Sequence, residues 1–235
     1  MRRKSKKSID IARRAEIGAE RRARTRMELL AAALELFGRP HGRNTRIEDL
    51  CTRARISRGT FYNYFVGIEP LLEALSDVLT RDFDAAVHRA MDQLPGPLER
   101  TSAAMRYYLH GALVDSRWGW AIVNSSVGTT LYGPGIARQV LASIQEGIDA
   151  GHFQLDYADV GRDIVLGTGI SATLSLLHGG TPPDYPEKVA HHVLLSLGAR
   201  PSRARATTAR PMRQLPRVQT DTPFFRGALG AVARG

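Results

Sequence analysis

The sequence has little cysteine and no long apolar run, and both absences narrow what the protein can be. Its single cysteine, Cys51, cannot form a disulfide within the chain. The longest stretch without charge, residues 164–183, contains four glycines and two prolines, which suits poorly a bilayer span of about 20 apolar residues. The basic start, residues 1–26, has no apolar run behind it and does not resemble a signal peptide. We expect a cytoplasmic protein with no membrane partner.

Signals for catalysis, metal binding and cofactor binding are also scarce. The histidines have no cysteine or acidic residue at the spacing of metal ligands. Two glycine pairs, in residues 133–135 and 167–169, are not followed by the lysine or third glycine of a phosphate-binding loop. No Gly-x-Ser-x-Gly elbow is present. The sequence therefore predicts no catalytic residue, no metal site, no cofactor and no enzymatic activity.

Positive charge is abundant, and it is concentrated at the two ends of the sequence. The formal net charge is +10. Residues 1–26 contain eleven Lys and Arg against three Asp and Glu, and residues 199–235 contain eight against one, whereas the stretch between them is acidic overall. We interpret residues 1–18 as a basic flexible arm and residues 201–235 as a basic, disordered tail. Such ends bind polyanions through counterion release, or they only keep a protein soluble.

Between these ends, the sequence reads as successive helices. An apolar stripe with three- and four-residue spacing predicts a first helix that stops at Gly38. The stripe consists of Leu30, Ala33, Leu34 and Phe37. Thr45 and Glu48 match a capping box, so we expect a second helix to begin at Thr45. Ser57 is the next cap, which leaves a turn of about three or four residues between two short helices.

The third helix has two contrasting faces when its residues are placed about 100° apart. Phe61 and Phe65 share one face, which we expect to pack against the first two helices. The opposite face carries the small or polar residues Gly59, Thr60 and Asn63. The helix and the turn before it contain no acidic residue. A narrow polar ridge without negative charge is the geometry with which a helix enters the major groove of DNA. An ordinary amphipathic helix is the alternative, but it does not account for the capped second helix, the tight turn and the basic arm.

Three motifs follow one another in this region. The first helix ends in Phe37-Gly38, residues 45–48 read Thr-x-x-Glu, and residues 57–65 read Ser-x-Gly-Thr-Phe-Tyr-x-Tyr-Phe. In these motifs residues 24–75 resemble the N-terminal DNA-binding domain of the TetR family of transcriptional regulators. The sequence departs from the family pattern at Arg55, where glycine is usual, and at Ile68, where a phosphate-binding lysine is common. The resemblance implies an all-α fold, with a three-helix helix-turn-helix DNA-binding domain followed by a C-terminal helical bundle for ligand binding and dimerisation.

The helical wheel and the resemblance together assign contacts with double-stranded DNA. We place the helix-turn-helix domain at residues 19–68 and the helical regulatory and dimerisation domain at residues 69–200. Base contacts are expected from the exposed ridge, and phosphate contacts from hydroxyl, phenol and guanidinium groups beside it. The expected base contacts are Gly59, Thr60 and Asn63. The expected phosphate contacts are Thr45, Arg55, Ser57, Arg58, Tyr62 and Tyr64.

Helical spacing continues beyond Pro70 in a long fourth helix that ends at residues 95–97. Further helices are expected near residues 98–113, 117–127, 134–151, 157–178 and 186–198. Small residues at helical spacing, together with the apolar side of the last helix, predict a face for a homodimer, and packing within one chain is the alternative. The expected dimer-face residues are Thr168, Ala172, Ser175, Val189, Val193 and Leu197.

Both tryptophans and several polar side chains occur within about twenty residues. Large rings with a few hydrogen-bonding groups line ligand pockets, but they are equally common in plain cores. Because the resembled family responds to ligands, we expect a pocket here for an unidentified small-molecule effector. The scarcity of charge favours an apolar or aromatic effector. The expected lining residues are Met105, Tyr108, His110, Trp118, Trp120 and Asn124.

These observations predict a TetR-like transcriptional regulator that binds a palindromic operator as a homodimer. A repressor that the effector releases from DNA is the expected mechanism. One alternative is a sequence-indifferent DNA-coating protein that uses its basic ends. The other is a helical small-molecule-binding protein or enzyme with an inert DNA domain.

Overall fold

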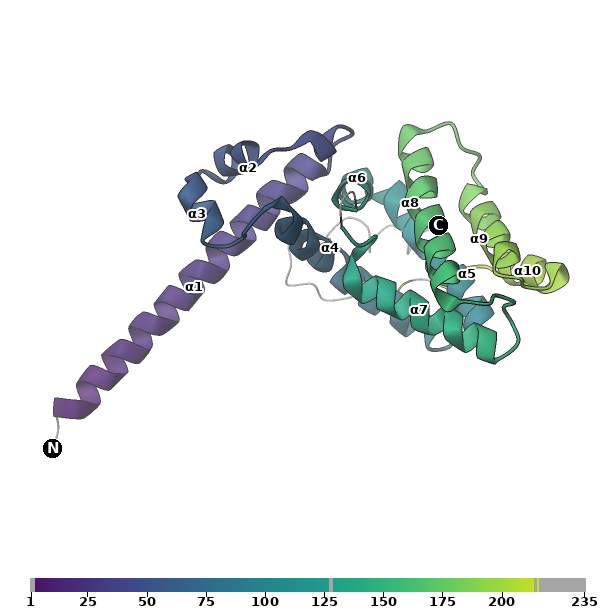
Figure 1. Ribbon diagram of the computed structural model, residues 1–235, viewed down its shortest axis with the longest axis horizontal. Coiled ribbons are helices and arrows are strands. Elements are labelled where there is room, and N and C mark those ends of the chain that lie inside the picture. The colour runs from purple at the N-terminus through teal and green to yellow at the C-terminus, as the bar shows by residue number, and fades with distance from the viewer. Residues whose placement is uncertain (1–2, 127–128, 214, 216–235) are drawn as a thin grey trace.

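The computed structural model describes residues 3–126, 129–213 and 215, and this part of the chain contains helices and no strand (Figure 1). The expected all-α fold is therefore confirmed. Three helices and a short 3-10 turn form the N-terminal domain. They are α1 (Arg3–Phe37), η1 (Gly42–Asn44), α2 (Ile47–Ala54) and α3 (Arg58–Tyr62).

The remaining described helices form the C-terminal domain. They are α4 (Ile68–Met91), α5 (Pro97–Val114), α6 (Ser116–Ser125), α7 (Gly133–Asp149), α8 (Ala158–His178), α9 (Tyr185–Ser196) and α10 (Pro201–Thr208). A proline occupies the first turn of α5, α7, α9 and α10, where its missing N–H leaves no helical hydrogen bond unmade. The ends of α5 to α9 lie within two residues of those expected from the sequence, which is the usual uncertainty of a helix boundary.

The two basic ends differ from the prediction. Residues 3–18, expected as a flexible arm, are the first half of α1, because this stretch lacks proline and is rich in Lys and Arg, which favour helix. Residues 201–208, expected in a disordered tail, form α10 instead. Ala204, Thr207 and Thr208 are buried where α10 packs on α5 and α9. This side of α10 carries no arginine, so it can pack although the segment is basic. The remainder of the expected tail, residues 216–235, lies outside the described residues.

The apolar core connects the two domains through α4. One cluster of buried side chains begins with Leu30 and Phe37 of α1, continues through Leu71 and Leu79 of α4, and reaches Trp118 of α6. A second cluster fills the space between α5, α7, α8 and α9. Figure 1 shows α2 and α3 beside α1, at the opposite side of the molecule from α8 to α10. A change in the C-terminal helices can therefore reach the N-terminal domain through α4 and α6, which both pack against α1.

Candidate functional site

The third helix is fixed to its domain by the two phenylalanines on its inner face. Phe61 is fully buried and Phe65 is 5% exposed, and the Phe65 amide bonds the Phe61 carbonyl at 3.0 Å, so both rings point the same way. The Arg26 guanidinium lies over the Phe65 ring, 5.3 Å from its centroid, and closes this side against α1. The expected inward face of α3 is thus confirmed.

Two short helices begin at hydrogen-bonded caps, one as expected and one shifted by a residue. Ser57 caps α3, since its hydroxyl accepts from the Thr60 amide at 3.0 Å. The predicted capping box at Thr45 and Glu48 is wrong. Instead, the Asp49 carboxylate accepts from the Arg46 backbone amide at 2.8 Å, and the N-cap of α2 is Arg46, one residue later than the expected cap at Thr45. Thr45 ends the preceding 3-10 turn, with its amide bonded to the Gly42 carbonyl.

The outer face of α3 carries the residues expected to read bases. Gly59 and Asn63 are exposed and Thr60 is half-buried. The Thr60 hydroxyl lies 2.9 Å from the Ser57 hydroxyl, so part of its hydrogen-bonding capacity is used within the helix. The helix itself ends at Tyr62, and Asn63 follows in helical geometry with its amide bonded to the Thr60 carbonyl. The structure therefore brings all three residues to one outward side.

The side chains expected to contact phosphate differ in how available they are. Tyr62 is 46% exposed, whereas Tyr64 is half-buried against the apolar core. Arg58 forms an ion pair with Glu48 at 2.8 Å and lies beside the Tyr62 phenol. Arg53 is similarly paired with Glu35 of α1. The sequence around α3 lacks acids, but the fold brings two of them in from other helices.

Residues 53–58 contain three arginines, and Arg55 is the one that has no acidic partner in the described part of the chain. It lies exposed in the turn between α2 and α3, with φ 57° and ψ 44°, in the left-handed region. Its amide bonds the Thr52 carbonyl and the Ile56 amide bonds the Cys51 carbonyl, which ends α2 sharply. This conformation explains why glycine is usual here in the resembled family, since only glycine adopts it without steric cost.

The C-terminal domain contains two adjoining cavities, of about 50 Å³ and about 70 Å³. Tyr108, Ala104, Ile136, Val140 and Val165 border both of them. The smaller cavity is otherwise lined by Met105, Tyr132, Leu166 and Gly169, and is almost entirely apolar. The larger one reaches polar side chains of α4, α5 and α7, which are Asp84, His88, Arg100, Thr101, Gln139 and Ser143.

Titratable groups around these cavities are shifted by burial and by one ion pair. Burial raises the pKa of Tyr108 well above its usual value and raises that of Tyr132 to about 12, so both phenols remain protonated. The Asp84 carboxylate, whose Oδ1 lies 3.2 Å from His88 Nδ1, raises the pKa of His88 to about 9. His88 is therefore a cation at neutral pH, paired with Asp84.

Of the six expected lining residues, Met105 and Tyr108 border these two cavities. Trp118, Trp120 and Asn124 do not line either of them and have other contacts. Trp118 is fully buried between Phe83 and Tyr108, and its indole N–H donates to the Leu79 carbonyl. Trp120 lies edge-on to His178. Asn124 donates to the carbonyls of Phe37 and Arg39 at 2.7 and 2.8 Å, and so joins α6 to the end of α1.

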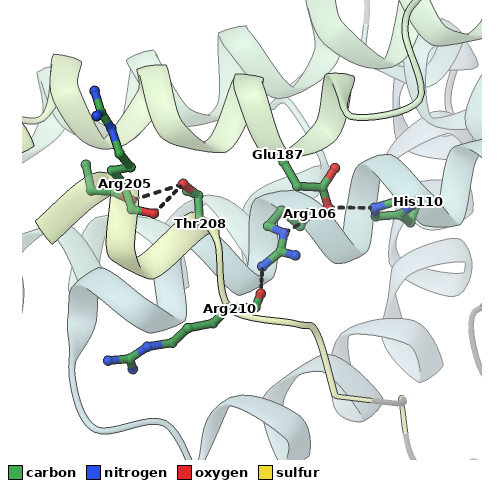
Figure 2. A network of polar contacts seen from close by, with 7 residues as sticks. Arg106, His110, Glu187, Arg205, Thr208 and Arg210 are labelled. Atoms are coloured by element: carbon green, nitrogen blue, oxygen red, sulfur yellow. Dashed lines mark hydrogen bonds and ion pairs between the residues drawn. The ribbon is translucent and has the colours of Figure 1, made fainter. Parts of the chain in front are cut away.

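His110 does not line either of the two cavities, and it belongs to a polar network on the other side of α5 (Figure 2). Its Nε2 lies 3.2 Å from Glu187 Oε1, an oxygen that also accepts from Arg106 Nε. Arg106 is 7% exposed, and its Nη1 donates to the Arg210 carbonyl at 2.9 Å. The Tyr107 hydroxyl donates to the Arg213 carbonyl at 2.7 Å. Sequence reasoning missed this network, which holds the segment after α10 against α5.

The expected dimer face is only partly available. Ala172, Val193 and Leu197 are buried inside the chain, where they belong to the second core cluster. Thr168, Ser175 and Val189 are half-buried. The outward stripe of α8 is a different set, in which Val160 and Ser171 are exposed and the others are half-buried. It consists of Val160, Ile164, Gly167, Ser171 and Leu174.

Helix α8 is unusual because it is apolar on more than its packed side. By length and composition alone it is the one described helix that could cross a membrane, but only 33% of its most apolar window is buried. It packs against α5, α6, α7 and α9, as a core helix does. Its outer face is therefore a largely apolar surface that the described part of one chain leaves without a partner.

Among the described residues, no three His, Cys, Asp or Glu side chains lie close enough together to hold a metal ion.

Residues 29–75 match the family model for bacterial regulatory proteins of the tetR family. A search of curated protein sequences gives no match. Among solved structures, RolR in complex with resorcinol is 24% identical over 84% of this chain and 100% of that chain, with a TM-score of 0.64. The fatty acid degradation regulator FadR from Bacillus halodurans is 18% identical over 74% and 96%, with a TM-score of 0.54. A TetR-family regulator from Haemophilus influenzae is 15% identical over 74% and 97%, with a TM-score of 0.53.

The fold and the exposed third helix define a helix-turn-helix DNA-binding protein with a C-terminal helical domain. Residues 29–75 resemble the N-terminal domain of tetR-family bacterial regulators, and the chain as a whole has a fold similar to that of RolR. The resemblance seen in the sequence is confirmed.

Proposed function

We propose that this protein is a transcriptional repressor that binds a palindromic operator as a homodimer and is released by a small-molecule effector. The observation that carries the proposal is the third helix, with Phe61 and Phe65 inside and Gly59, Thr60 and Asn63 outside. This ridge fits a major groove, where Asn63 and Thr60 can bond base edges and Gly59 permits close approach. Thr45, Arg55, Ser57, Arg58, Tyr62 and Tyr64 surround it as proposed phosphate contacts.

Dimerisation supports operator binding, because two recognition helices must reach major grooves about 34 Å apart. The outward stripe of α8 is the proposed interface, together with the outer side of α9. Gly167 and Ser171 at its centre are small, so a second helix could approach closely, and Val160 and Leu174 supply apolar area. A two-fold axis here would present the same stripe twice, as symmetric dimers require.

The effector is proposed to occupy the two adjoining cavities beside Tyr108. The apolar lining favours an apolar or aromatic compound, and one relative of similar fold binds resorcinol. Tyr108 contacts the Trp118 ring on α6, and α6 holds α1 through Asn124. An effector that moves Tyr108 would therefore change the position of the DNA-binding domain. Release follows if the effector prefers a dimer whose recognition helices are wrongly spaced, and the DNA affinity lost equals that preference.

A footprint on the DNA beside the protein's own gene tests this function. We expect protection of an inverted repeat, lost when a suitable effector is added. Uniform coverage that depends only on salt would indicate a DNA-coating protein instead. Conversion of a bound small molecule to a product, with no protected site, would indicate an enzyme with an inert DNA domain.

A further inference from the structure

Helix α5 carries two neighbouring hydroxyl groups that are buried and have no hydrogen-bond partner among the described residues. They belong to Thr101 and Ser102, which are 6% and 2% exposed. Buried hydroxyls in folded proteins are nearly always hydrogen-bonded, so each of these points to a partner that is not part of the chain. They face different spaces. Thr101 borders the cavity beside Asp84, and Ser102 borders a separate hollow beneath residues 210–213.

The Asp84 carboxylate lines the same cavity as the Thr101 hydroxyl and is a hydrogen-bond acceptor. Its Oδ1 accepts from Tyr108 at 3.4 Å, which is long for an O–H···O bond, and lies 3.2 Å from His88 Nδ1. Asp84 therefore retains capacity to accept a further hydrogen bond. The other charges at this end are compensated, since His88 pairs with Asp84 and Arg100 pairs with Glu146.

The rest of the space is suited to a single ring. The two adjoining cavities together are slightly smaller than the roughly 150 Å³ that accommodates a benzene molecule in an apolar protein cavity. Tyr108, Tyr132, Ile136 and Val165 offer apolar contacts on several sides. Gln139, which lines the larger cavity, is exposed.

We propose that the effector is a neutral single-ring compound with a hydroxyl group, a phenol in the simplest case. Its hydroxyl accepts a hydrogen bond from Thr101 Oγ1 and donates one to the Asp84 carboxylate, while its ring lies beside Tyr108 and Tyr132. A carboxylate of the same size binds more weakly, because it has no proton to donate to the Asp84 carboxylate, and two carboxylate oxygens without a shared proton repel each other even though His88 and Arg100 line the same cavity. This inference rests on the proposed function, since it names the class of ligand for the same cavity.

The experiment compares three ligands of similar shape, which are phenol, toluene and benzoate, by calorimetric titration of the full-length protein. The variant Thr101→Val keeps the side-chain shape and removes the hydroxyl. We expect it to weaken phenol binding about 2- to 10-fold and to leave toluene binding unchanged, as for loss of one neutral hydrogen bond. Ser102→Ala is the matched control, because it removes the neighbouring unpartnered hydroxyl, which faces the separate hollow beneath residues 210–213. It should change the affinity for neither phenol nor toluene.

A second variant, Asp84→Asn, tests the charge. We expect weaker phenol binding, because a neutral amide is a poorer acceptor, and tighter benzoate binding, because the repulsion is gone. Equal losses for phenol and toluene in Thr101→Val, benzoate binding tighter than phenol in the wild-type protein, or no binding of any of the three would overturn the inference. The footprint is independent of these titrations, so a protected operator with no phenol binding would leave the proposed function standing.

Discussion

The side-chain amide of Asn124, on α6, lies 2.7 Å from the carbonyl oxygen of Phe37, the last residue of α1. The same amide nitrogen donates to the Arg39 carbonyl at 2.8 Å. Backbone carbonyls at the end of a helix have no partner within the helix. One side chain of the C-terminal domain therefore completes the end of the first helix of the DNA-binding domain.

Replacing Asn124 by alanine should destabilise the protein strongly, although the change removes only a few atoms. The change leaves the Phe37 carbonyl buried without a donor, and we expect a loss of about 2 kcal/mol or more in the free energy of unfolding. Urea denaturation of the two proteins measures this loss. Asn63→Ala is the control, because Asn63 is exposed and its removal should change stability by less than about 0.5 kcal/mol. Similar losses in both variants would mean that Asn124 does not join the domains.

Asn63 and Tyr62 should affect DNA binding in different ways. We expect Asn63→Ala to relax the preference for one base pair by about 1–3 kcal/mol, because a base contact is lost. Tyr62→Phe should weaken binding to all sequences alike, because a phosphate contact carries no sequence information. Binding to the operator and to single-base variants of it measures both effects. Equal losses on operator and random DNA for both variants would contradict this division.

Features set by neighbouring residues were predictable from the sequence. The ends of α5 to α9 follow from local proline and glycine positions, and the inner face of α3 follows from Phe61 and Phe65 at four-residue spacing. Arg55 in the turn was recognised as a departure from the family pattern, and the left-handed geometry gives the reason.

Features that depend on distant partners were not predictable. Asn124 bonds a carbonyl 87 residues away, and no local signal distinguishes that role from a place in a pocket. The small residues of α8 looked like a dimer seam, but Gly161 makes room for Ile144 and Gly169 for Tyr132 within the chain. Glycine at helical spacing shows that something approaches closely, and it does not show whether the neighbour belongs to the same chain.

Arg55 should carry a cost in stability and a benefit in DNA binding. We expect Arg55→Gly to stabilise the fold by about 0.5 kcal/mol, because relief of the left-handed strain outweighs the added freedom of the unfolded chain. The variant should also bind all DNA more weakly, with the salt dependence of binding reduced by about one ion. Thermal unfolding and binding at several salt concentrations measure the two effects.

Arg55→Ala separates these effects, since alanine loses the charge but keeps the strain. It should weaken DNA binding as much as Arg55→Gly does, without the gain in stability. If both variants retain the salt dependence of the wild-type protein, Arg55 does not contact phosphate.

The ion pair between His88 and Asp84 should make stability depend on pH. Asp84 raises the pKa of His88 from about 6.5 in the unfolded chain to about 9 in the folded protein. The pair therefore contributes fully below about pH 6.5, and its contribution is lost as the pH rises through 9. We expect the wild-type protein to lose stability between these values relative to His88→Gln, which cannot titrate. Parallel curves for the two proteins over that range would show that the pair contributes nothing.

The outward stripe of α8 should control whether the protein can bind its operator. Ser171 is exposed near the centre of the stripe, and no residue that the structure describes covers it. An arginine at this position would place a charge and a long side chain between two closely packed helices, so we expect Ser171→Arg to be monomeric at micromolar concentration. Light scattering after gel filtration measures the mass. The variant should keep the wild-type free energy of unfolding within about 0.5 kcal/mol per chain, apart from any dependence on protein concentration, because the side chain points to solvent in one chain.

Gln145→Arg, on the exposed side of α7, is the matched control and should remain dimeric. The monomeric variant should bind the operator more weakly than the dimeric wild-type protein, because a single recognition helix loses the contribution of the second half-site. A dimeric Ser171→Arg variant with unchanged operator binding would place the interface elsewhere on the molecule.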